Sequence, residues 1–255
     1  MSHEITASRP TLSALVALAG AGLCACDEAD AASGSTSFTG RVEFPASVAT
    51  VTVPDSDFAR AAAELAFAAS PEYLSNHLMR TYLFGALLLR AQGRAHDPEL
   101  TFATAMLHDL GLVEPYISPD RRFELDSADT AAQFLSEQGR SAEEIEIVWE
   151  GIALHLTGDI VTRMAPEIAF VALGAAADAV GAGLDQLSGA DVNAVLQAYP
   201  RLGFKEAAVQ GIIDQCERKP FAYALHPWAE VARRHNADFP APTVEDLIRA
   251  APFTD

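Results

Sequence analysis

The feature that most constrains the fold is a helical pattern that continues with few interruptions from Asp57 almost to the end of the chain. Apolar residues recur at spacings of three and four, which is the period of one face of an α-helix. Alanine, the best helix former, dominates the apolar residues. The sequence therefore predicts an all-α domain over residues 57–250, built from closely packed helices.

Several of the expected helices carry local start signals. Pro98 and Pro166 suit the first turn of a helix, and Ser141 with Glu144 matches a capping box. The helices expected from these signals and from the periodicity are 58–69, 75–92, 98–110, 127–138, 142–154, 166–182, 189–199, 204–217, 228–236 and 244–250.

Residues 1–35 differ from the rest of the chain. They contain an uncharged apolar run, 11–25, which is short for a bilayer span but fits the hydrophobic region of a signal peptide. The last three residues of the run and Cys26 after it read Leu-Cys-Ala-Cys, which resembles the lipobox of bacterial lipoproteins. A polar stretch suited to a flexible tether follows. We expect an exported, lipoprotein-like head anchored at Cys26. The alternative is a cytoplasmic extension, because Glu4 offsets the positive charge of Arg9.

Residues 36–56 are expected to form an extended arm on the domain. They include the stretch GRVEFPASVATVTVP, whose β-branched residues alternate in part with other types. The chain thus divides into a head with its tether (1–35), an arm (36–56) and a helical domain (57–250).

The charge balance bears on the partners of the protein. The chain has 35 acidic and 17 basic side chains and a formal net charge of −18. Such a surface repels the phosphates of nucleic acids and anionic lipid headgroups. We therefore expect a small-molecule substrate, no nucleic-acid partner and no membrane contact beyond a lipid anchor at Cys26. The sequence does not indicate an oligomeric state.

A histidine–aspartate pair stands at the end of the helix expected over 98–110. Apolar or small residues precede His108, so the pair is expected to be buried, at a cost unless hydrogen bonds or a cation satisfy it. Neighbouring side chains on a helix point about 100° apart. At a helix end, which Gly111 provides, His108 and Asp109 can share one target. Alone, the pair is a weak indication of a metal site.

Two further residues strengthen this indication. Asp178 lies in AFVALGAAADAVGAG, a helix of small and apolar residues in which an aspartate needs a partner. His77 lies in SNHLMRTYLFGALLLRAQG, on a face otherwise made of Leu, Tyr and Phe. Two imidazoles and two carboxylates together suit zinc, iron or manganese.

The order His77, His108-Asp109, Asp178 resembles the signature of the HD-domain superfamily of metal-dependent hydrolases. The pieces SNHLMRTYLFGALL, ELTFATAMLHDLGL, RRFELDSADTAAQFL, WEGIALHLTGDI and DAVG are similar to its cyanamide hydratase-like branch, over roughly residues 40–250. The resemblance implies a single HD-domain helical bundle that binds one divalent transition metal through these four residues. Zinc is the expected metal, with iron or manganese as alternatives.

His155 is the one other histidine between His108 and Asp178. HD enzymes with two metals use additional histidines in this interval, usually more than one, so the resemblance favours a single metal. We expect His155 to act as a general base or to contact the substrate. The alternative is a half-buried histidine with a structural role.

Glu124 and Asp126 follow the histidine–aspartate helix, where the branch carries a similar Phe-Glu-x-Asp piece. We expect both to line the cavity and to move protons. The alternative is that Asp126 or Ser127 caps the next helix at its N-terminus. Arg121 and Arg122 either orient an anionic substrate or lie in a surface loop.

These features predict a hydrolase or hydratase that acts on a small, nitrogen-containing molecule through a metal-activated water. Asp109 would bind the metal and help take the proton of the water, and His155 or Glu124 would pass a proton to nitrogen. One alternative is an HD phosphohydrolase acting on nucleotides or phosphomonoesters, which the few basic residues near the motifs disfavour. Another alternative is a binding or sensory HD module without catalysis.

Overall fold

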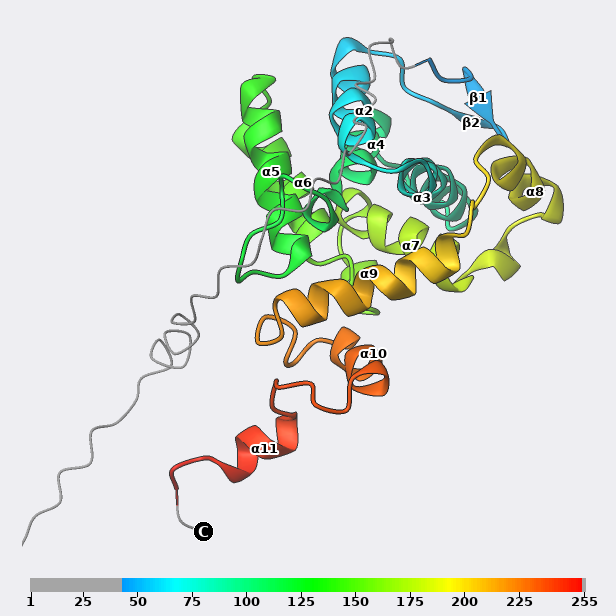
Figure 1. The fold of residues 1–255 in the computed structure, drawn as a ribbon. Helices are drawn as coiled ribbons and strands as arrows, with labels where there is room; N and C mark the ends of the chain where they lie inside the picture. Colours follow the sequence, from blue (N-terminus) through cyan, green and yellow to red (C-terminus); the bar gives the residue numbers. More distant parts are fainter. Residues whose placement is uncertain (1–42, 254–255) are drawn as a thin grey trace, which may run out of the picture. The chain divides into compact units, whose positions relative to one another are not determined.

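The computed structural model describes residues 43–253, so the predictions for residues 1–35 and for the start of the arm lie outside the described residues. The described part is an all-α bundle preceded by a short β-hairpin, which confirms the predicted fold class (Figure 1). Its elements are β1 (Ser47–Val48), β2 (Val51–Thr52), α2 (Asp57–Ala69), α3 (Glu72–Ala91), α4 (Pro98–Leu107), η1 (Leu110–Leu112), α5 (Phe123–Glu137), α6 (Ala142–Ala153), η2 (Val161–Arg163), α7 (Pro166–Val180), η3 (Leu184–Gln186), α8 (Gly189–Ala198), α9 (Phe204–Arg218), α10 (Trp228–His235) and α11 (Val244–Arg249).

The hairpin lies against the bundle. Its strands pair antiparallel, with Val48 opposite Val51, and both valine side chains are buried. The hydroxyl of Tyr82 in α3 donates a hydrogen bond to the carbonyl of Thr52 (3.0 Å). This part of the expected arm is therefore fixed to the helical core.

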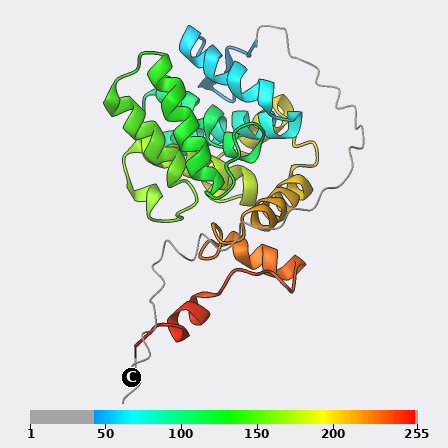
Figure 2. The same ribbon diagram turned by 60° about the vertical axis from the view of Figure 1, so that its left-hand side comes forward.

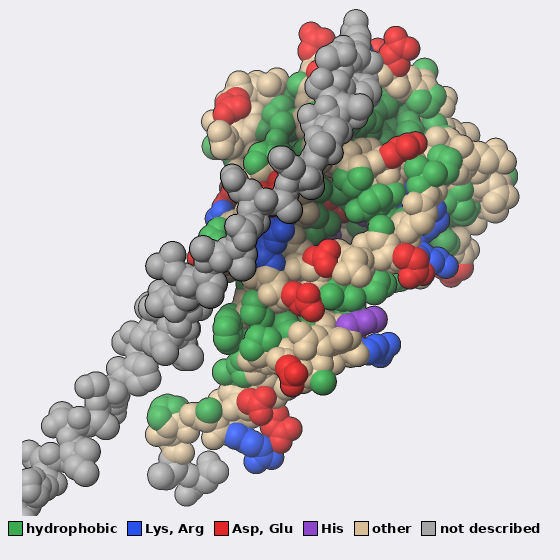
Figure 3. Space-filling view, viewed as in Figure 1, with side chains coloured by type: hydrophobic (Ala, Val, Ile, Leu, Met, Phe, Trp, Pro, Cys, Tyr) green, Lys and Arg blue, Asp and Glu red, His purple; other side chains and the backbone are tan. Residues whose placement is uncertain are grey.

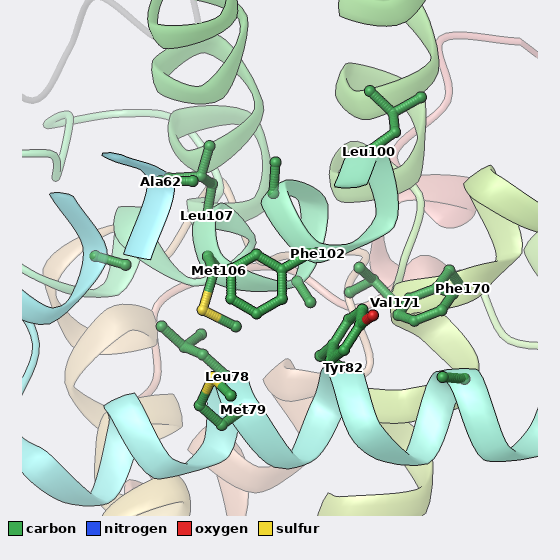
Figure 4. Close-up of a cluster of buried hydrophobic side chains, with 14 of the residues drawn as sticks. Ala62, Leu78, Met79, Tyr82, Leu100, Phe102, Met106, Leu107, Phe170 and Val171 are labelled. Atoms are coloured by element: carbon green, nitrogen blue, oxygen red, sulfur yellow. The ribbon is translucent and has the colours of Figure 1, made fainter. Parts of the chain in front are cut away.

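The core is centred on α3, which packs most extensively against α7 and is buried along most of its length. Figure 4 shows Phe102 of α4 lying above Leu78 and Met79 of α3. The ring of Tyr82 meets that of Phe102 edge to face, with centroids 5.0 Å apart, and lies 5.7 Å from that of Phe170 in α7. Buried aromatic rings of this size supply a large share of the apolar area that drives folding. They fix α3, α4 and α7 relative to one another, and these helices carry the candidate site residues.

The close approach of α3 and α7 depends on a glycine. A Cβ atom at Gly174 would lie 2.0 Å from the carbonyl oxygen of Thr81, a distance no side chain can occupy. Because the hydrogen of glycine takes no such space, the two helix backbones approach closely. This contact places the later part of α7 beside the first half of α3.

The start of α5 corrects the sequence prediction. The helix begins at Phe123, four residues before the predicted start at Ser127, and both Asp126 and Ser127 are buried inside it. The alternative reading of Asp126 or Ser127 as an N-terminal cap is therefore wrong. The backbone N–H of Phe123 donates to the hydroxyl of Tyr223 (2.9 Å), so a residue 100 positions away satisfies the first turn.

The C-terminal helices lie on one side of the bundle. In Figures 1 and 2, α9 runs across the bundle, and α10 lies on the far side of α9 from the bundle. The segment after α9 is tied to α5 by an ion pair between Lys219 Nζ and Asp126 Oδ2 (3.1 Å), in which both side chains are buried. The region downstream of α8 is therefore joined to the helix that follows the histidine–aspartate pair.

Two further observations concern the surface. Figure 3 shows Asp and Glu side chains spread over the visible face among apolar ones, as the negative net charge leads one to expect. In residues 43–253, no helix is both long enough and apolar enough to cross a membrane.

Replacing Gly174 by Ala should destabilise the protein, because the added methyl group meets the backbone of α3. Overpacking of this kind lowers the free energy of unfolding by about 1–3 kcal/mol. Urea unfolding followed by circular dichroism measures the change. Gly211→Ala in α9 is the control, since a Cβ there meets open space. That variant should gain up to about 1 kcal/mol from helix propensity. Equal stability of Gly174→Ala and the wild type would contradict the close-approach argument.

Candidate metal centre

The histidine–aspartate pair lies where α4 ends. His108 is the C-terminal cap of α4 and Asp109 follows in a non-helical conformation, at the start of the turn η1. Because the chain leaves the helix here, the two neighbouring side chains can turn toward one point. Both are buried, with residue exposures of 1% for His108 and 6% for Asp109.

Three side chains place metal-donor atoms together. They are His77 of α3, His108 and Asp109, whose donor atoms all lie within 4.8 Å of one another. Asp109 Oδ2 is 3.3 Å from His108 Nε2 and 3.5 Å from His77 Nε2. Ligands about 2.1 Å from a tetrahedral metal ion are separated by about 3.4 Å. The two spacings from Asp109 therefore match edges of a tetrahedral metal site.

The hydrogen bonds of the two histidines leave lone pairs facing this point. His77 Nδ1 is 2.6 Å from Asp178 Oδ2, and His108 Nδ1 is 2.8 Å from the carbonyl oxygen of Ala105. Both partners are acceptors, so each Nδ1 carries the proton and each Nε2 has a free lone pair. His108 Nε2 has no hydrogen-bond partner in the described part of the chain. Two lone pairs and a carboxylate oxygen that converge in a buried site repel one another unless a cation joins them.

The pKa values are consistent with this arrangement. Burial, followed by the repulsion that a protonated His77 would exert, lowers the pKa of His108 to about 3, so the His108 imidazole is neutral and able to bind a metal. Burial raises the pKa of Asp109, since the ionised carboxylate is poorly solvated there. A metal ion beside Asp109 would oppose that shift. The donor set thus fits a divalent metal ion of the borderline class.

Asp178 does not belong to the group of three donors. Besides His77, its carboxylate accepts two hydrogen bonds from Arg80, from Nε to Oδ1 and from Nη2 to Oδ2, both 2.8 Å. Arg201 Nη1 donates to the same Oδ1 at 2.7 Å. Burial raises the pKa of Asp178, but the hydrogen bonds from His77 and Arg80 outweigh burial and bring it to about 2. The structure therefore places Asp178 behind His77, as the carboxylate that orients a ligand histidine, and not at the position predicted for a fourth ligand.

His155 lies beside the donor group. Its ring is 5.2 Å from that of His108, centroid to centroid, and both rings line one cavity. The Nδ1 of His155 is 2.6 Å from the carbonyl of Ile152, so this nitrogen carries the proton. Burial, followed by the repulsion that a protonated His108 would exert, lowers the pKa of His155 to about 4. A neutral imidazole with an unprotonated Nε2 can accept a proton at neutral pH.

Glu124 and Asp126 do not line this cavity, contrary to the prediction. The carboxylate of Glu124 is paired with Arg122 and lies 3.3 Å from His226 Nε2, and that of Asp126 is paired with Lys219. Both acids face the segment that follows α9, so their partners come from parts of the chain that local sequence does not reveal. Arg122 is occupied by Glu124, and Arg121 pairs with acidic side chains of α5. Neither arginine is directed at the metal donors.

Three residues near the centre were not predicted from the sequence. Phe204, the first residue of α9, stacks on the ring of His77 with centroids 4.5 Å apart. Arg201 completes the hydrogen bonds of Asp178, and Tyr73 lines the cavity. Burial, followed by the charge of Asp109, raises the pKa of Tyr73, which places its hydroxyl in the field of the donor group. Of these three residues, only Tyr73 could have been placed near the centre from the sequence, because it lies four residues before His77 and therefore on the same helix face.

Replacing Asp178 by Asn should weaken metal binding without removing the site. An amide is a poorer acceptor for the Nδ1–H of His77, and loss of such a partner costs about 10- to 100-fold in metal affinity. Competition with a chromophoric chelator measures the affinity for zinc, and elemental analysis measures the stoichiometry. Asp185→Asn, at an exposed residue, is the control. Complete loss of the metal would instead support Asp178 as a ligand.

The protein should lose stability in acid partly through Glu124. Burial raises the pKa of this carboxyl, but hydrogen bonds from His226 and Arg122 outweigh burial and lower the pKa to about 2. A depressed carboxyl pKa stabilises the fold above the unfolded-state pKa and ceases to do so as the pH falls toward the folded-state value.

Glu124→Gln should therefore reduce stability at neutral pH and flatten its decline between about pH 4.5 and pH 2. Urea unfolding at a series of pH values measures both effects. Glu146→Gln, at an exposed position on α6, is the control. A variant with the same acid dependence as the wild type would show that Glu124 does not contribute.

Comparison with known families agrees with this geometry. Residues 74–183 match the family model described as HD domain, and the matched segment includes all three donors, His155 and Asp178. No curated protein matches the chain. The match, together with the buried His-His-Asp group, supports the assignment of residues 74–183 to the HD superfamily.

Proposed function

We propose that the protein is a metal-dependent hydrolase or hydratase that acts on an uncharged, nitrogen-containing molecule, in the manner of the cyanamide hydratase-like branch. The observation that carries the proposal is the convergence of two imidazole lone pairs and one carboxylate on a cavity wall. Catalytic zinc sites use three protein ligands and keep one position open. Zinc is the metal we expect, with iron or manganese as alternatives, since two histidines and a carboxylate also form an iron site.

The charges around the donors favour an uncharged substrate over a phosphate. Recognition of phosphate calls for several guanidinium or ammonium donors aimed at it. Arg80 and Arg201 are occupied by Asp178, the carboxylate that also contacts His77. Of the described residues that line the cavity, Arg218 is the one lysine or arginine. Its Nη1 lies 2.8 Å from Glu114 Oε1, so its charge is already paired. The acidic side chain of Asp214 also lines the cavity.

The side chains have distinct roles in such a reaction. A divalent metal held by the three donors supplies Lewis-acid activation of water and of a nitrile- or amide-like carbon. His155 Nε2 accepts a proton from the attacking water and returns it to the substrate nitrogen, so no further reactant is needed. Asp178 holds the ring of His77 in place during the reaction, and Tyr73 is a polar side chain of the cavity wall.

An activity screen tests the proposal. The metal-free protein is loaded with zinc, iron(II) or manganese and is assayed on cyanamide, nitriles, amides, nucleotides and phosphomonoesters. We expect turnover of a substrate with a carbon–nitrogen bond, dependent on metal and lost in His108→Ala. Phosphate release alone would replace the proposal with the phosphohydrolase alternative. A stoichiometric metal with no turnover in any class would favour a binding module.

His155→Ala should separate proton transfer from metal binding. Removing a positioned general base lowers kcat by about 10²- to 10⁴-fold. The metal content should stay at the wild-type level, because His155 is not one of the three donors. His235→Ala, on an exposed position of α10, is the matched control. Loss of the metal in His155→Ala would show that His155 is a ligand.

A further inference from the structure

The cavity above the donors is large for a molecule of a few atoms. Its volume is about 680 Å³, and it extends from His77, His108 and Asp109 to α9 and Trp228. Cavities of roughly 300–1,000 Å³ hold ligands of drug-like size. The volume exceeds what a nitrile or amide group needs, so the remaining space requires an explanation.

Two strips of small side chains, one on α7 and one on α9, line this space. On α7 the strip recurs at helical spacing, so its members share one face, and it comprises Ala172, Ala175, Ala176 and Ala179. On α9 the strip comprises Ala207, Ala208 and Gly211. Longer apolar side chains at these positions would fill the cavity. The space is therefore built by the choice of residues on two helices, one inside and one outside the segment that matches the HD domain.

The rest of the wall is largely apolar. Phe123 and Trp228 stack in parallel, with centroids 4.7 Å apart, and Leu112, Val113 and Ile117 join them in lining the cavity. One set of polar atoms lies at the donor group, where His108 Nε2 is buried and has no partner in the described residues. A second set lies along α9, where Gln210, Asp214, Gln215 and Arg218 line the cavity. A ligand that fits this wall has a polar head at the donors and an apolar body along the two strips.

We infer that the substrate carries an uncharged apolar body, and that this body lies between the alanine strip of α7 and the Ala207–Gly211 strip of α9. The inference rests on the proposed function, because the metal donors define where the reacting group lies. It sets the substrate class: an amide or nitrile of an alkyl or aryl compound, larger than cyanamide. Gly211 is then a residue that determines specificity through the length of body that the cavity admits.

Alkyl hydroxamates test the inference without turnover, because their head group chelates metal ions and their chains vary in length. The zinc-loaded protein is titrated by calorimetry with acetohydroxamate, butyrohydroxamate, hexanohydroxamate and octanohydroxamate. Burying one methylene is worth about a three- to fourfold gain in affinity, so we expect such a gain at each added methylene. A chain that ends in a carboxylate should bind no better than acetohydroxamate, because the apolar wall does not solvate the charge.

The possible outcomes separate the two proposals. Affinity that does not rise with chain length would overturn the apolar-body inference and leave the metal-dependent activity standing. A zinc-loaded protein that binds no hydroxamate would overturn the open metal position, and with it the proposed function. Equal gains from the carboxylate-ended chain would overturn the requirement for an uncharged body.

The variant Gly211→Leu tests where the apolar body of the ligand lies. A Cβ at Gly211 meets open space, so a leucine can enter the cavity without a backbone clash. We expect octanohydroxamate to lose about tenfold or more in affinity, equivalent to about two methylenes, while acetohydroxamate binds as in the wild type. Gly189→Leu in α8 is the matched control, because that position is also open but does not line the cavity. Unchanged binding of octanohydroxamate in Gly211→Leu would overturn the placement between the two strips.

Discussion

The carboxylate of Asp178 is the group on which the arrangement of the centre depends. It accepts hydrogen bonds from His77 and Arg80 of α3 and from Arg201, which precedes α9. Removing one partner from a buried charge network leaves an uncompensated charge, which is far more costly than losing an exposed ion pair. This one side chain therefore fixes the orientation of a donor histidine, the packing of α3 on α7 and the start of α9.

The helices were predictable because their signals are local. Asp97 caps α4 and accepts from the N–H groups of Glu99 and Leu100, and Ser141 with Glu144 forms the capping box at the start of α6. The start of α5 was not predictable, since the group that satisfies its first N–H is the hydroxyl of Tyr223. A local pattern shows where a helix can begin, whereas a distant partner can extend it.

The residues of the candidate site likewise divide into those that the sequence predicted and those whose partners come from distant parts of the chain. The sequence predicted that His108 and Asp109 share a partner, because a buried imidazole and carboxylate at a helix end need one, and the resemblance to the HD superfamily added His77 to them. The same reasoning predicted that Asp178 needs a partner, which we expected to be the metal, whereas the resemblance led us to expect Glu124 at the cavity. The structure supplies arginines to Asp178, and Arg122 and His226 to Glu124. Which acid faces the cavity is decided by the tertiary packing of cationic residues, and charge patterns along the chain do not contain that information.

Because Phe204 stacks on His77, the first turn of α9 contacts the metal centre and the later turns do not. Its first turn touches a donor ring and the guanidinium groups of Arg80 and Arg201, whose carbon atoms lie 5.4 and 4.9 Å from the Phe204 ring centre. Its middle turns line the cavity through Ala207, Ala208 and Gly211, while Ile212 packs against the buried cluster that contains Tyr223. Substitutions in the middle turns can therefore alter what the protein admits while the reaction centre stays intact. The helix thus provides a route by which the protein can acquire new substrates during evolution without rebuilding its chemistry.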